Sequence, residues 1–418
     1  MSGASETAMT GAVRRGTNLP RVAGYNQVLV LDLIRRAPGL SRSDLVRRTG
    51  LTMQTLSNIC RRLVEAGLIR EAGRVRSGMG APRIVYEVEP EGRYAVGLHI
   101  DPARLTFAVL DLAGKVVAER TSPVPDPSDP PHVLDAIDGG VRAVLRELEI
   151  PMDRVAGLGV ATPGPIDAPR GVVVAPPQLP GWDLVPLRDD LQARLEMPVV
   201  LEKDNTAAAM GEVWKAPRDG ESFAFLYLGT GAAAGIVRDG EVLRGSGASF
   251  GNIAHMAADP DGPHCSCGGR GCVNVSAWPG AIVADGMAAG ALEPVDTGDP
   301  HAVELALAEL ARVSREVPDS SAAQVLERAA GSFARVAVQL ANLLDLDAIV
   351  FGGSQWPALE ETFLRVVPEL VNRAFIARSF RSVEVRGTSV GGPVGAIGAA
   401  ALVLQETMFD ATGQLHLQ

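Results

Sequence analysis

The sequence has few aromatic residues, only four cysteines and no long hydrophobic run. Aromatic side chains are 4% of its 418 residues, so the 46% of hydrophobic residues are mostly aliphatic, and they suffice for a large globular core. No stretch approaches the roughly 18 consecutive apolar residues that a membrane-spanning helix needs, and the first twenty residues lack the apolar segment of a signal peptide. We therefore expect a cytoplasmic protein with no membrane partner.

The formal net charge of −10 argues, taken alone, against binding to nucleic acid, because neutralised phosphates drive that binding. The charge is unevenly distributed. Residues 1–93 hold fifteen Arg, no Lys and eight acidic residues, a net charge of +7, so the remaining residues carry −17. A basic segment joined to an acidic one indicates a nucleic-acid-binding module attached to a different domain.

Residues 21–93, here called the head, contain three helix signals. YNQVLVLDLIRRAPG has apolar residues at helical spacing and ends in a Pro-Gly stop. Ser41 is placed to cap a short helix that ends at Gly50, and Thr52 is placed to cap a third helix. This is the order of a helix-turn-helix unit, whose last helix enters the major groove of DNA.

The third helix is predicted to have an apolar stripe and a polar face. The stripe consists of Leu56, Ile59, Cys60, Leu63 and Val64, and it makes Cys60 a core residue and not a reactive thiol. On the other side, Gln54 and Asn58 suit adenine edges, and the two arginines suit guanine or phosphate. The DNA contacts expected from this helix are Thr52, Gln54, Thr55, Ser57, Asn58, Arg61 and Arg62.

Two strand signals follow, LIREAG and RVRSGMGAPRIVYEVEP, joined by a tip rich in Gly and Arg. They predict a wing, and its residues Arg74, Arg76 and Arg83 suit phosphates or a narrow minor groove. The alternative is a helical protein-interaction domain with solvated arginines, because charge runs are usually only solvated faces. The wing favours DNA binding.

Residues 94–418, here called the body, alternate strand and helix signals. RYAVGLHIDPARLTFAVLDLAGKVVAER predicts two strands around a turn, and a helix and further strands follow, several ending in Gly-rich loops. This pattern predicts an α/β architecture with two lobes and a site where the loops converge. The expected first lobe is about 94–204 plus the C-terminal helix, and the second is about 205–390.

The segment HMAADPDGPHCSCGGRGC holds three of the four cysteines. His255, Cys265, Cys267 and Cys272 have the pattern H-x9-C-x-C-x4-C, which predicts a closed, tetrahedral Zn²⁺ site, one per chain, with a structural role. Free thiols or a disulfide are the alternatives, and disulfides rarely persist in the cytoplasm. His264 is a competing nitrogen ligand.

Several segments, in the same order, resemble the ROK family (repressors, open reading frames and sugar kinases). The run LGTGAAAGIVRDGEVLRGSGASFGNIAHMAADPDGPHCSCGGRGCVN resembles the family signature, and VATPGPID, LPGWDLVPL, EKDNTAAAMGE and LANLLDLDAIVFGG also resemble family segments. The resemblance implies the actin-like, two-lobed sugar-kinase fold for the body. Family members with a winged head are transcriptional regulators, and those without it are usually ATP-dependent sugar kinases.

The sequence departs from the family kinases at the loops that would hold ATP. The first loop, Asp-x-Gly-Gly-Thr in those kinases, is His99-Ile100-Asp101-Pro102-Ala103 here. A carboxylate repels phosphates and proline removes a backbone donor, and Ala233 replaces a glycine of the second loop. We therefore expect no kinase activity and no catalytic residue, with Asp204 standing at the position of the kinases' base.

The resemblance also implies a sugar pocket, formed here by Gln178, Lys203, Asp204, Asn252, His255 and Asn274. Relative to the kinases, an Asn has become Lys203 and two Glu have become Asn252 and Asn274, which shifts the charge by about +3. One hypothesis is a relic pocket in which Lys203 pairs with Asp204. The other is an effector site that favours an anionic ligand, such as a phosphorylated or acidic sugar.

Taken together, the sequence predicts a flexible arm over residues 1–20, a winged helix-turn-helix head and a ROK body. We expect a transcriptional repressor that binds an inverted-repeat operator in double-stranded DNA as a homo-oligomer, either a dimer or a tetramer, and that responds to a sugar or sugar phosphate. The alternatives are a sugar kinase with a DNA-binding head and a DNA-binding protein without an effector.

Overall fold

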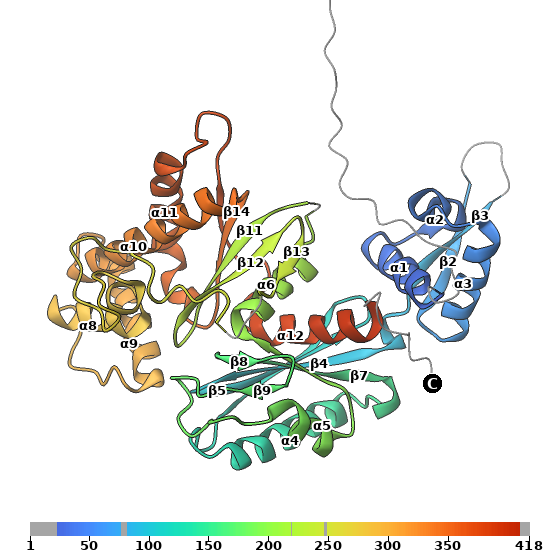
Figure 1. The fold of residues 1–418 in the computed structure, drawn as a ribbon, viewed down its shortest axis with the longest axis horizontal. Helices are drawn as coiled ribbons and strands as arrows, with labels where there is room; N and C mark the ends of the chain where they lie inside the picture. The colour runs from blue at the N-terminus through green and yellow to red at the C-terminus, as the bar shows by residue number, and fades with distance from the viewer. Residues whose placement is uncertain (1–22, 77–81, 219, 246–248, 410–418) are drawn as a thin grey trace, which may run out of the picture.

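The computed structural model describes residues 23–76, 82–218, 220–245 and 249–409. They form a small head beside a body that is built on two five-stranded sheets (Figure 1). The predicted flexible arm and the tip of the predicted wing lie outside the described residues. Within the described ranges, no helix combines the length and the apolar character that crossing a membrane requires.

The head contains three helices and a sheet with strand order β1-β3-β2. Both predicted caps form, because the Ser41 side chain accepts a hydrogen bond from the backbone of Asp44 in a capping box and the Thr52 side chain accepts one from the backbone of Thr55. Gly50 ends the second helix in the left-handed conformation. The predicted winged helix-turn-helix is confirmed. Its elements are α1 (Ala23–Arg36), β1 (Leu40–Ser41), α2 (Arg42–Thr49), α3 (Met53–Glu65), β2 (Ile69–Val75) and β3 (Arg83–Val88).

The apolar stripe of α3 is buried except at its end. Leu56, Ile59, Cys60 and Leu63 lie in the core, whereas Val64 is 40% exposed, so the predicted stripe is one residue too long. Val64 lies in the last turn of α3, where the chain leaves the helix toward β2. Burial raises the pKa of the Cys60 thiol to about 11, which keeps it protonated and unreactive at neutral pH.

The first lobe is a mixed sheet with strand order β10-β7-β4-β5-β6. One face packs on α4 and α5, and the other packs on α12. The sequence predicts two strands after residue 93, but the structure has three, because β6 is an exposed edge strand without an apolar repeat. The elements are η2 (Pro90–Gly92), β4 (Tyr94–Asp101), β5 (Arg104–Asp111), β6 (Val116–Pro123), α4 (Pro130–Glu147), η3 (Met152–Arg154), β7 (Val155–Thr162), β8 (Ile166–Asp167), β9 (Val172–Val173), α5 (Leu187–Leu195) and β10 (Val199–Lys203).

The second lobe is a sheet with strand order β13-β12-β11-β14-β15 and a layer of helices on one face (Figure 1). Several of the scarce aromatic residues gather here, where the Phe351 and Trp356 rings stack with centroids 5.3 Å apart and both contact Phe363. The elements are β11 (Phe223–Leu228), β12 (Ala232–Arg238), β13 (Glu241–Leu243), α7 (Val273–Ser276), α8 (Pro279–Ala288), α9 (Pro300–Glu316), α10 (Ser321–Leu344), β14 (Ala348–Gly352), α11 (Trp356–Ala374) and β15 (Glu384–Gly387).

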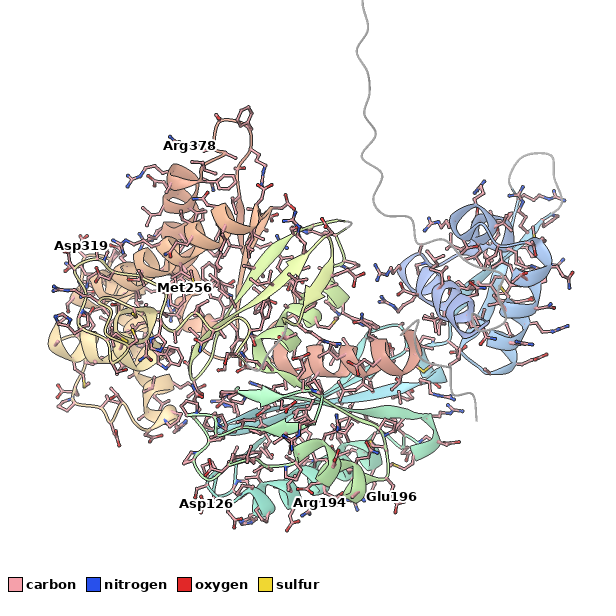
Figure 2. All side chains as sticks on the ribbon, viewed as in Figure 1. Asp126, Arg194, Glu196, Met256, Asp319 and Arg378 are labelled. Atoms are coloured by element: carbon pink, nitrogen blue, oxygen red, sulfur yellow. The ribbon has the colours of Figure 1, made fainter. Side chains whose placement is uncertain are left out.

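Two helices lie between the sheets, α6 (Asp204–Lys215) and α12 (Val394–Leu404). α12 packs on the first sheet and α6 on the second, and the two helices cross in close contact. A β-carbon added at Gly398 would overlap the carbonyl oxygen of Ala207, so the backbones themselves touch. Charged side chains such as Arg194 and Arg378 lie on the periphery, away from this crossing (Figure 2).

The head does not have a separate core. One hydrophobic cluster includes residues of α1 and α3 in the head together with α12 in the body, among them Ile34 and Leu404. α12 is followed by a short π-helical segment, η4 (Gln405–Phe409), which also contacts α1. The head and the body therefore share buried surface.

The α6–α12 crossing is sensitive to added volume. We expect Gly398→Ala to lower the thermal midpoint strongly, with a loss of about 3 kcal/mol or more, because the methyl group overlaps backbone that cannot move aside. The matched control is Gly331→Ala in α10, where no described atom beyond the local helix lies within 4 Å of the new carbon.

The control replacement should raise the stability by roughly 0.5–1 kcal/mol, because alanine loses less conformational freedom than glycine in a helix. Thermal unfolding of both variants measures the difference. Equal midpoints for the two variants would contradict the backbone contact.

Candidate functional site

The α3 face that the sequence assigns to DNA is open to solvent. Thr52, Gln54, Arg61 and Arg62 are exposed, and Thr55, Ser57 and Asn58 are half-buried. Some of these side chains form hydrogen bonds with one another. The Thr52 and Thr55 hydroxyls lie 2.9 Å apart, and Arg61 Nη2 donates to Asn58 Oδ1 at 3.2 Å. Ser57 Oγ accepts a hydrogen bond from Arg42 at 3.1 Å, which adds a cation of α2 to this face.

The wing supplies further exposed arginines. β2 and β3 pair antiparallel, with Arg74 opposite Ile84 and Val75 opposite Arg83. Arg74 and Arg76 are exposed, and Arg83 Nη1 donates to Ser43 Oγ of α2 at 3.1 Å. α3 and the wing thus present arginines on the same small domain, which is the distribution that phosphate binding requires.

A cavity with a volume of about 370 Å³ lies between the lobes. All six residues of the predicted pocket line it: Gln178, Lys203, Asp204, Asn252, His255 and Asn274. They come from both lobes and from loops that are far apart in the sequence. The structure therefore brings the predicted pocket residues together.

Lys203 does not form the ion pair with Asp204 that one hypothesis proposes. Its Nζ instead donates to the backbone oxygen of Phe250 at 2.7 Å, across the cavity wall, and no carboxylate in the described chain lies within 4 Å of it. Burial lowers the pKa of the Lys203 ammonium, and the charges of Asp204 and Glu202 partly oppose this.

Asp204 is the first residue of α6, and its Oδ1 accepts a hydrogen bond from the backbone N–H of Asn205 at 2.7 Å. Burial raises the pKa of the Asp204 carboxyl, while His99 and Lys203 act in the opposite direction. The side chain of Asn205 donates to the carbonyl oxygen of Ala234 at 2.7 Å, which joins the start of α6 to β12. The helix N-terminus is thereby attached to the second lobe.

The loop that departs from the family kinases forms a tight hairpin between β4 and β5. Asp101 Oδ1 accepts a hydrogen bond from the backbone of Ala103 at 3.0 Å, and Asp101 Oδ2 accepts one from Thr230 Oγ1 at 2.8 Å. Thr230 belongs to the second Gly-rich loop, after β11. The two loops, one in each lobe, are therefore connected by a carboxylate.

Other cavity residues were not identified from the sequence. Tyr227, Thr230, Ser249, Ser266 and Trp278 also line the cavity. Neither periodicity nor spacing marks them, although Trp278 is one of only four tryptophans. The Trp278 ring packs so closely against Gly231 that a β-carbon at residue 231 would collide with the ring. This contact explains why residue 231 is a glycine.

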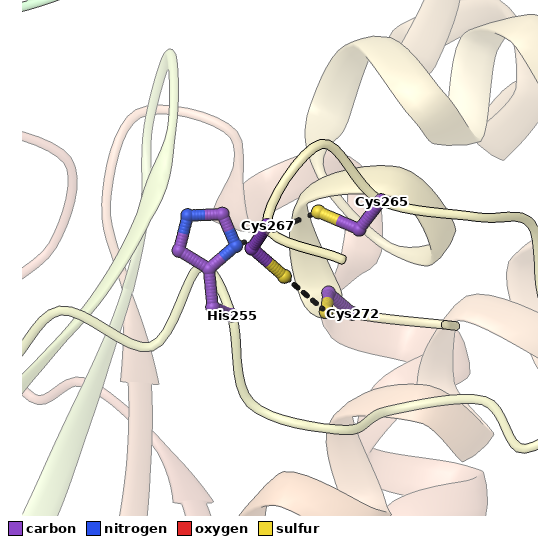
Figure 3. A group of neighbouring side chains, drawn as sticks. All are labelled: His255, Cys265, Cys267 and Cys272. Atoms are coloured by element: carbon purple, nitrogen blue, oxygen red, sulfur yellow. Dashed lines mark hydrogen bonds between the residues drawn. The ribbon is translucent and has the colours of Figure 1, made fainter. Parts of the chain in front are cut away.

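Four side chains beside the cavity could hold a metal ion. His255, Cys265, Cys267 and Cys272 place their ligand atoms within 4.8 Å of one another (Figure 3). Cys267 Sγ and Cys272 Sγ are 3.6 Å apart, and Cys265 Sγ is 3.5 Å from His255 Nδ1. Tetrahedral zinc with Zn–S bonds of about 2.3 Å requires sulfurs roughly 3.8 Å apart, so these residues fit it. None of the four cysteines is in a disulfide, and His264 is not in the group.

The ROK family profile matches residues 95–406, three quarters of the chain and nearly the whole body. The chain belongs to the ROK family. A profile of the MarR family matches residues 18–76, which include the helix-turn-helix. The ROK profile therefore covers the body of this protein, and the head is matched by the profile of a different family.

Full-length relatives include both a head and a body. The xylose repressor of Caldicellulosiruptor bescii is 25% identical over 92% of this chain and 96% of its own length. The DNA-binding transcriptional repressor Mlc of Escherichia coli is 24% identical over 96% of this chain and 97% of its own length. A glucokinase of Halalkalibacterium halodurans is 28% identical, but over 75% of this chain and 96% of its own.

Solved structures support the fold of both parts. The crystal structure of a ROK family transcriptional regulator, a homologue of the E. coli Mlc protein, matches with a TM-score of 0.77 and 21% identity over 94% of this chain and 98% of its own. A ROK hexokinase from Thermus thermophilus matches with a TM-score of 0.61 and 28% identity over 75% of this chain and 98% of its own. The predicted two-lobed sugar-kinase fold is confirmed.

Proposed function

We propose that this ROK protein is a DNA-binding transcriptional repressor whose body senses a sugar-derived effector. The observation that carries the proposal is the combination of an arginine-bearing winged helix-turn-helix with a polar cavity between two lobes. Relatives that match nearly the whole chain are named repressors, whereas the glucokinase matches 75% of it. A chromosomal partner implies a cytoplasmic location.

In the proposed complex, α3 enters the major groove and the wing arginines contact the flanking backbone. One head reads too few bases for a unique operator, so the proposal includes a homo-oligomer, a dimer or a tetramer, on an inverted repeat. The acidic body, with a net charge of −17, repels DNA elsewhere and confines binding to the head.

We also propose that this protein has lost kinase activity. Asp101 joins the β4–β5 hairpin to the Gly-rich loop after β11 by accepting the hydrogen bond from Thr230. A carboxylate at this position repels phosphate groups, and Pro102 has no N–H to donate to them. Asp204 keeps the position of a base, but without a bound phosphoryl donor a hydroxyl that it deprotonates has no phosphoryl group to attack.

The effector is proposed to be anionic, such as a phosphorylated or acidic sugar. A cavity of about 370 Å³ lies within the range of roughly 300–1,000 Å³ typical of small-molecule sites. A lysine ammonium has three N–H donors, and Lys203 uses one of them on Phe250, which leaves two for a ligand anion. Asn252 and Asn274 line the cavity without adding negative charge.

The metal is proposed to be one structural zinc ion held by His255, Cys265, Cys267 and Cys272. Three thiolates and one imidazole are a typical closed zinc set, and the bound ion would stabilise a loop that contributes little to the core. The His255 side chain also lines the cavity, so the metal would fix one wall of the effector site.

DNA binding is tested with the fragment that flanks the protein's own gene. We expect Arg62→Ala to weaken binding and to reduce the slope of log affinity against log salt by about one, because one phosphate contact is lost. Arg312→Ala is the control, since it removes the same charge from an exposed site on α9 of the body. Equal losses in the two variants, or no binding by the wild type, would contradict the proposed interface.

Metal analysis of the purified chain tests the zinc site. We expect one zinc per chain, lost in Cys267→Ser together with part of the thermal stability, because the thiolate is a ligand. Cys60→Ser should keep its full zinc content, because Cys60 is buried in the head, away from the cluster. Zinc retained by Cys267→Ser would contradict the ligand set.

Thermal-shift titration with glucose, xylose, N-acetylglucosamine and their phosphates tests the effector class. We expect a phosphorylated sugar to raise the thermal midpoint, and Lys203→Gln to abolish the rise, because the anion loses its cation. Stabilisation by neutral sugars but not by phosphorylated ones would contradict the anionic class. Sugar-dependent ATP turnover that disappears in Asp204→Ala would instead support the kinase alternative.

A further inference from the structure

One helix of the body touches both the cavity and the head. α6 begins at Asp204, which lines the cavity, and its next-to-last residue is Trp214, which lies against the head. Trp214 lies ten positions after Asp204 in the helix, a distance of about 15 Å along the axis. α6 therefore spans the distance between the site of the proposed effector and the DNA-binding domain.

The contact at the head is specific. The guanidinium carbon of Arg35, in α1, lies 3.8 Å from the centroid of the Trp214 ring. Arg35 is also held by Asp32, with Nη2 to Oδ1 at 3.1 Å, and only 8% of its side chain is exposed. A cation stacked on a tryptophan face and shielded from water forms a strong, orientation-dependent contact. The orientation of α1 is thus tied to the position of Trp214.

The contact at the cavity is equally direct. Asn205 joins the start of α6 to Ala234 of β12, and Lys203, immediately before the helix, donates to Phe250 of the second lobe. Asn252, two residues after Phe250, lines the cavity. A ligand that changes the separation of the two lobes must therefore displace the start of α6.

A second line of contacts runs in parallel. Arg244 pairs with Glu202 at 2.9 Å and with Glu406 at 2.8 Å. Glu202 precedes Lys203 in β10, and Glu406 lies in η4, which contacts α1. Arg244 thus links the strand that forms the cavity wall to the segment beneath the head.

We propose that Arg35 and Trp214 are positioning residues through which α6 couples the cavity to the DNA-binding head, with Arg244 as a second connection. This inference rests on the proposed function. α6 is one continuous helix that packs backbone to backbone on α12, so a displacement at Asp204 is carried along it to Trp214. The effector then acts by shifting the population between two orientations of the head.

A double-mutant cycle on the full chain tests the coupling without an identified effector. Asp204→Asn changes the cavity end and Arg35→Met removes the cation at the head end. Affinity for the fragment flanking the protein's own gene is measured for the wild type, both single variants and the double variant. We expect Asp204→Asn to change the affinity about five-fold or more in the wild-type background and less than about two-fold beside Arg35→Met.

The control is Arg381→Met, which removes a cation 5.0 Å from the Phe375 ring, in the second lobe. Asp204→Asn should keep its full effect in that background. A merely structural role for Arg35 would weaken binding equally with and without the cavity change, so additive effects overturn the coupling. The absence of any effect of Asp204→Asn in the wild-type background also overturns it.

Hydrogen exchange of α1 gives a readout that does not depend on DNA. We expect Asp204→Asn to change exchange in residues 23–36 of the wild type, and this difference to be several-fold smaller in the Arg35→Met background, where only the Arg244 connection remains. If the wild type binds no DNA but this difference is present, the proposed function fails and the coupling stands. If DNA is bound and exchange in α1 is unchanged, the coupling fails and the function stands.

Discussion

Backbone contact between α6 and α12 sets the separation of the two lobes at the point where the helices cross. α12 covers the first sheet and α6 the second, and no side chain separates them where Gly398 meets Ala207. The cavity lies at one end of α6 and the head at the other, so the positions of both follow from this crossing. Small residues are required here because any added volume would push the lobes apart.

The same fold occurs in a ROK hexokinase, and under the proposed function this chain uses the cleft differently. The change is concentrated in one hairpin, where Asp101 accepts hydrogen bonds from Ala103 and Thr230. A loop that binds phosphates must donate through its backbone amides, whereas this hairpin presents an acceptor. The cavity between the lobes keeps a polar lining, so under the proposed function it can bind a small ligand without a nucleotide beside it.

Local features of the fold were predictable from the sequence. Ser41, Gly50 and Thr52 end or cap helices through contacts within a few residues, and such contacts leave a pattern in the sequence. Two predictions were wrong. The edge strand β6 was missed because it is exposed and has no apolar repeat, and Val64 was assigned to the buried stripe of α3 although it is exposed. The four metal-ligating candidates lie within eighteen residues, and their spacing was enough to group them.

The cavity itself was predictable only through resemblance to a family. Gln178, Lys203 and Asn274 are far apart in the sequence, and no periodicity joins them. The hydrogen bond from Lys203 to the backbone of Phe250 could not have been inferred, because every residue carries the same carbonyl acceptor. The contact between Arg35 and Trp214 joins two domains, and it depends on the α6–α12 crossing, which sequence patterns do not specify.

His255 belongs both to the metal-ligating group and to the cavity wall. Two ligands that share one side chain cannot bind independently. If occupation of the cavity holds the imidazole in place, it strengthens metal binding, and thermodynamic linkage requires the metal to strengthen effector binding by the same factor. Under the proposed function, removal of the structural zinc ion would therefore weaken effector binding through this one residue.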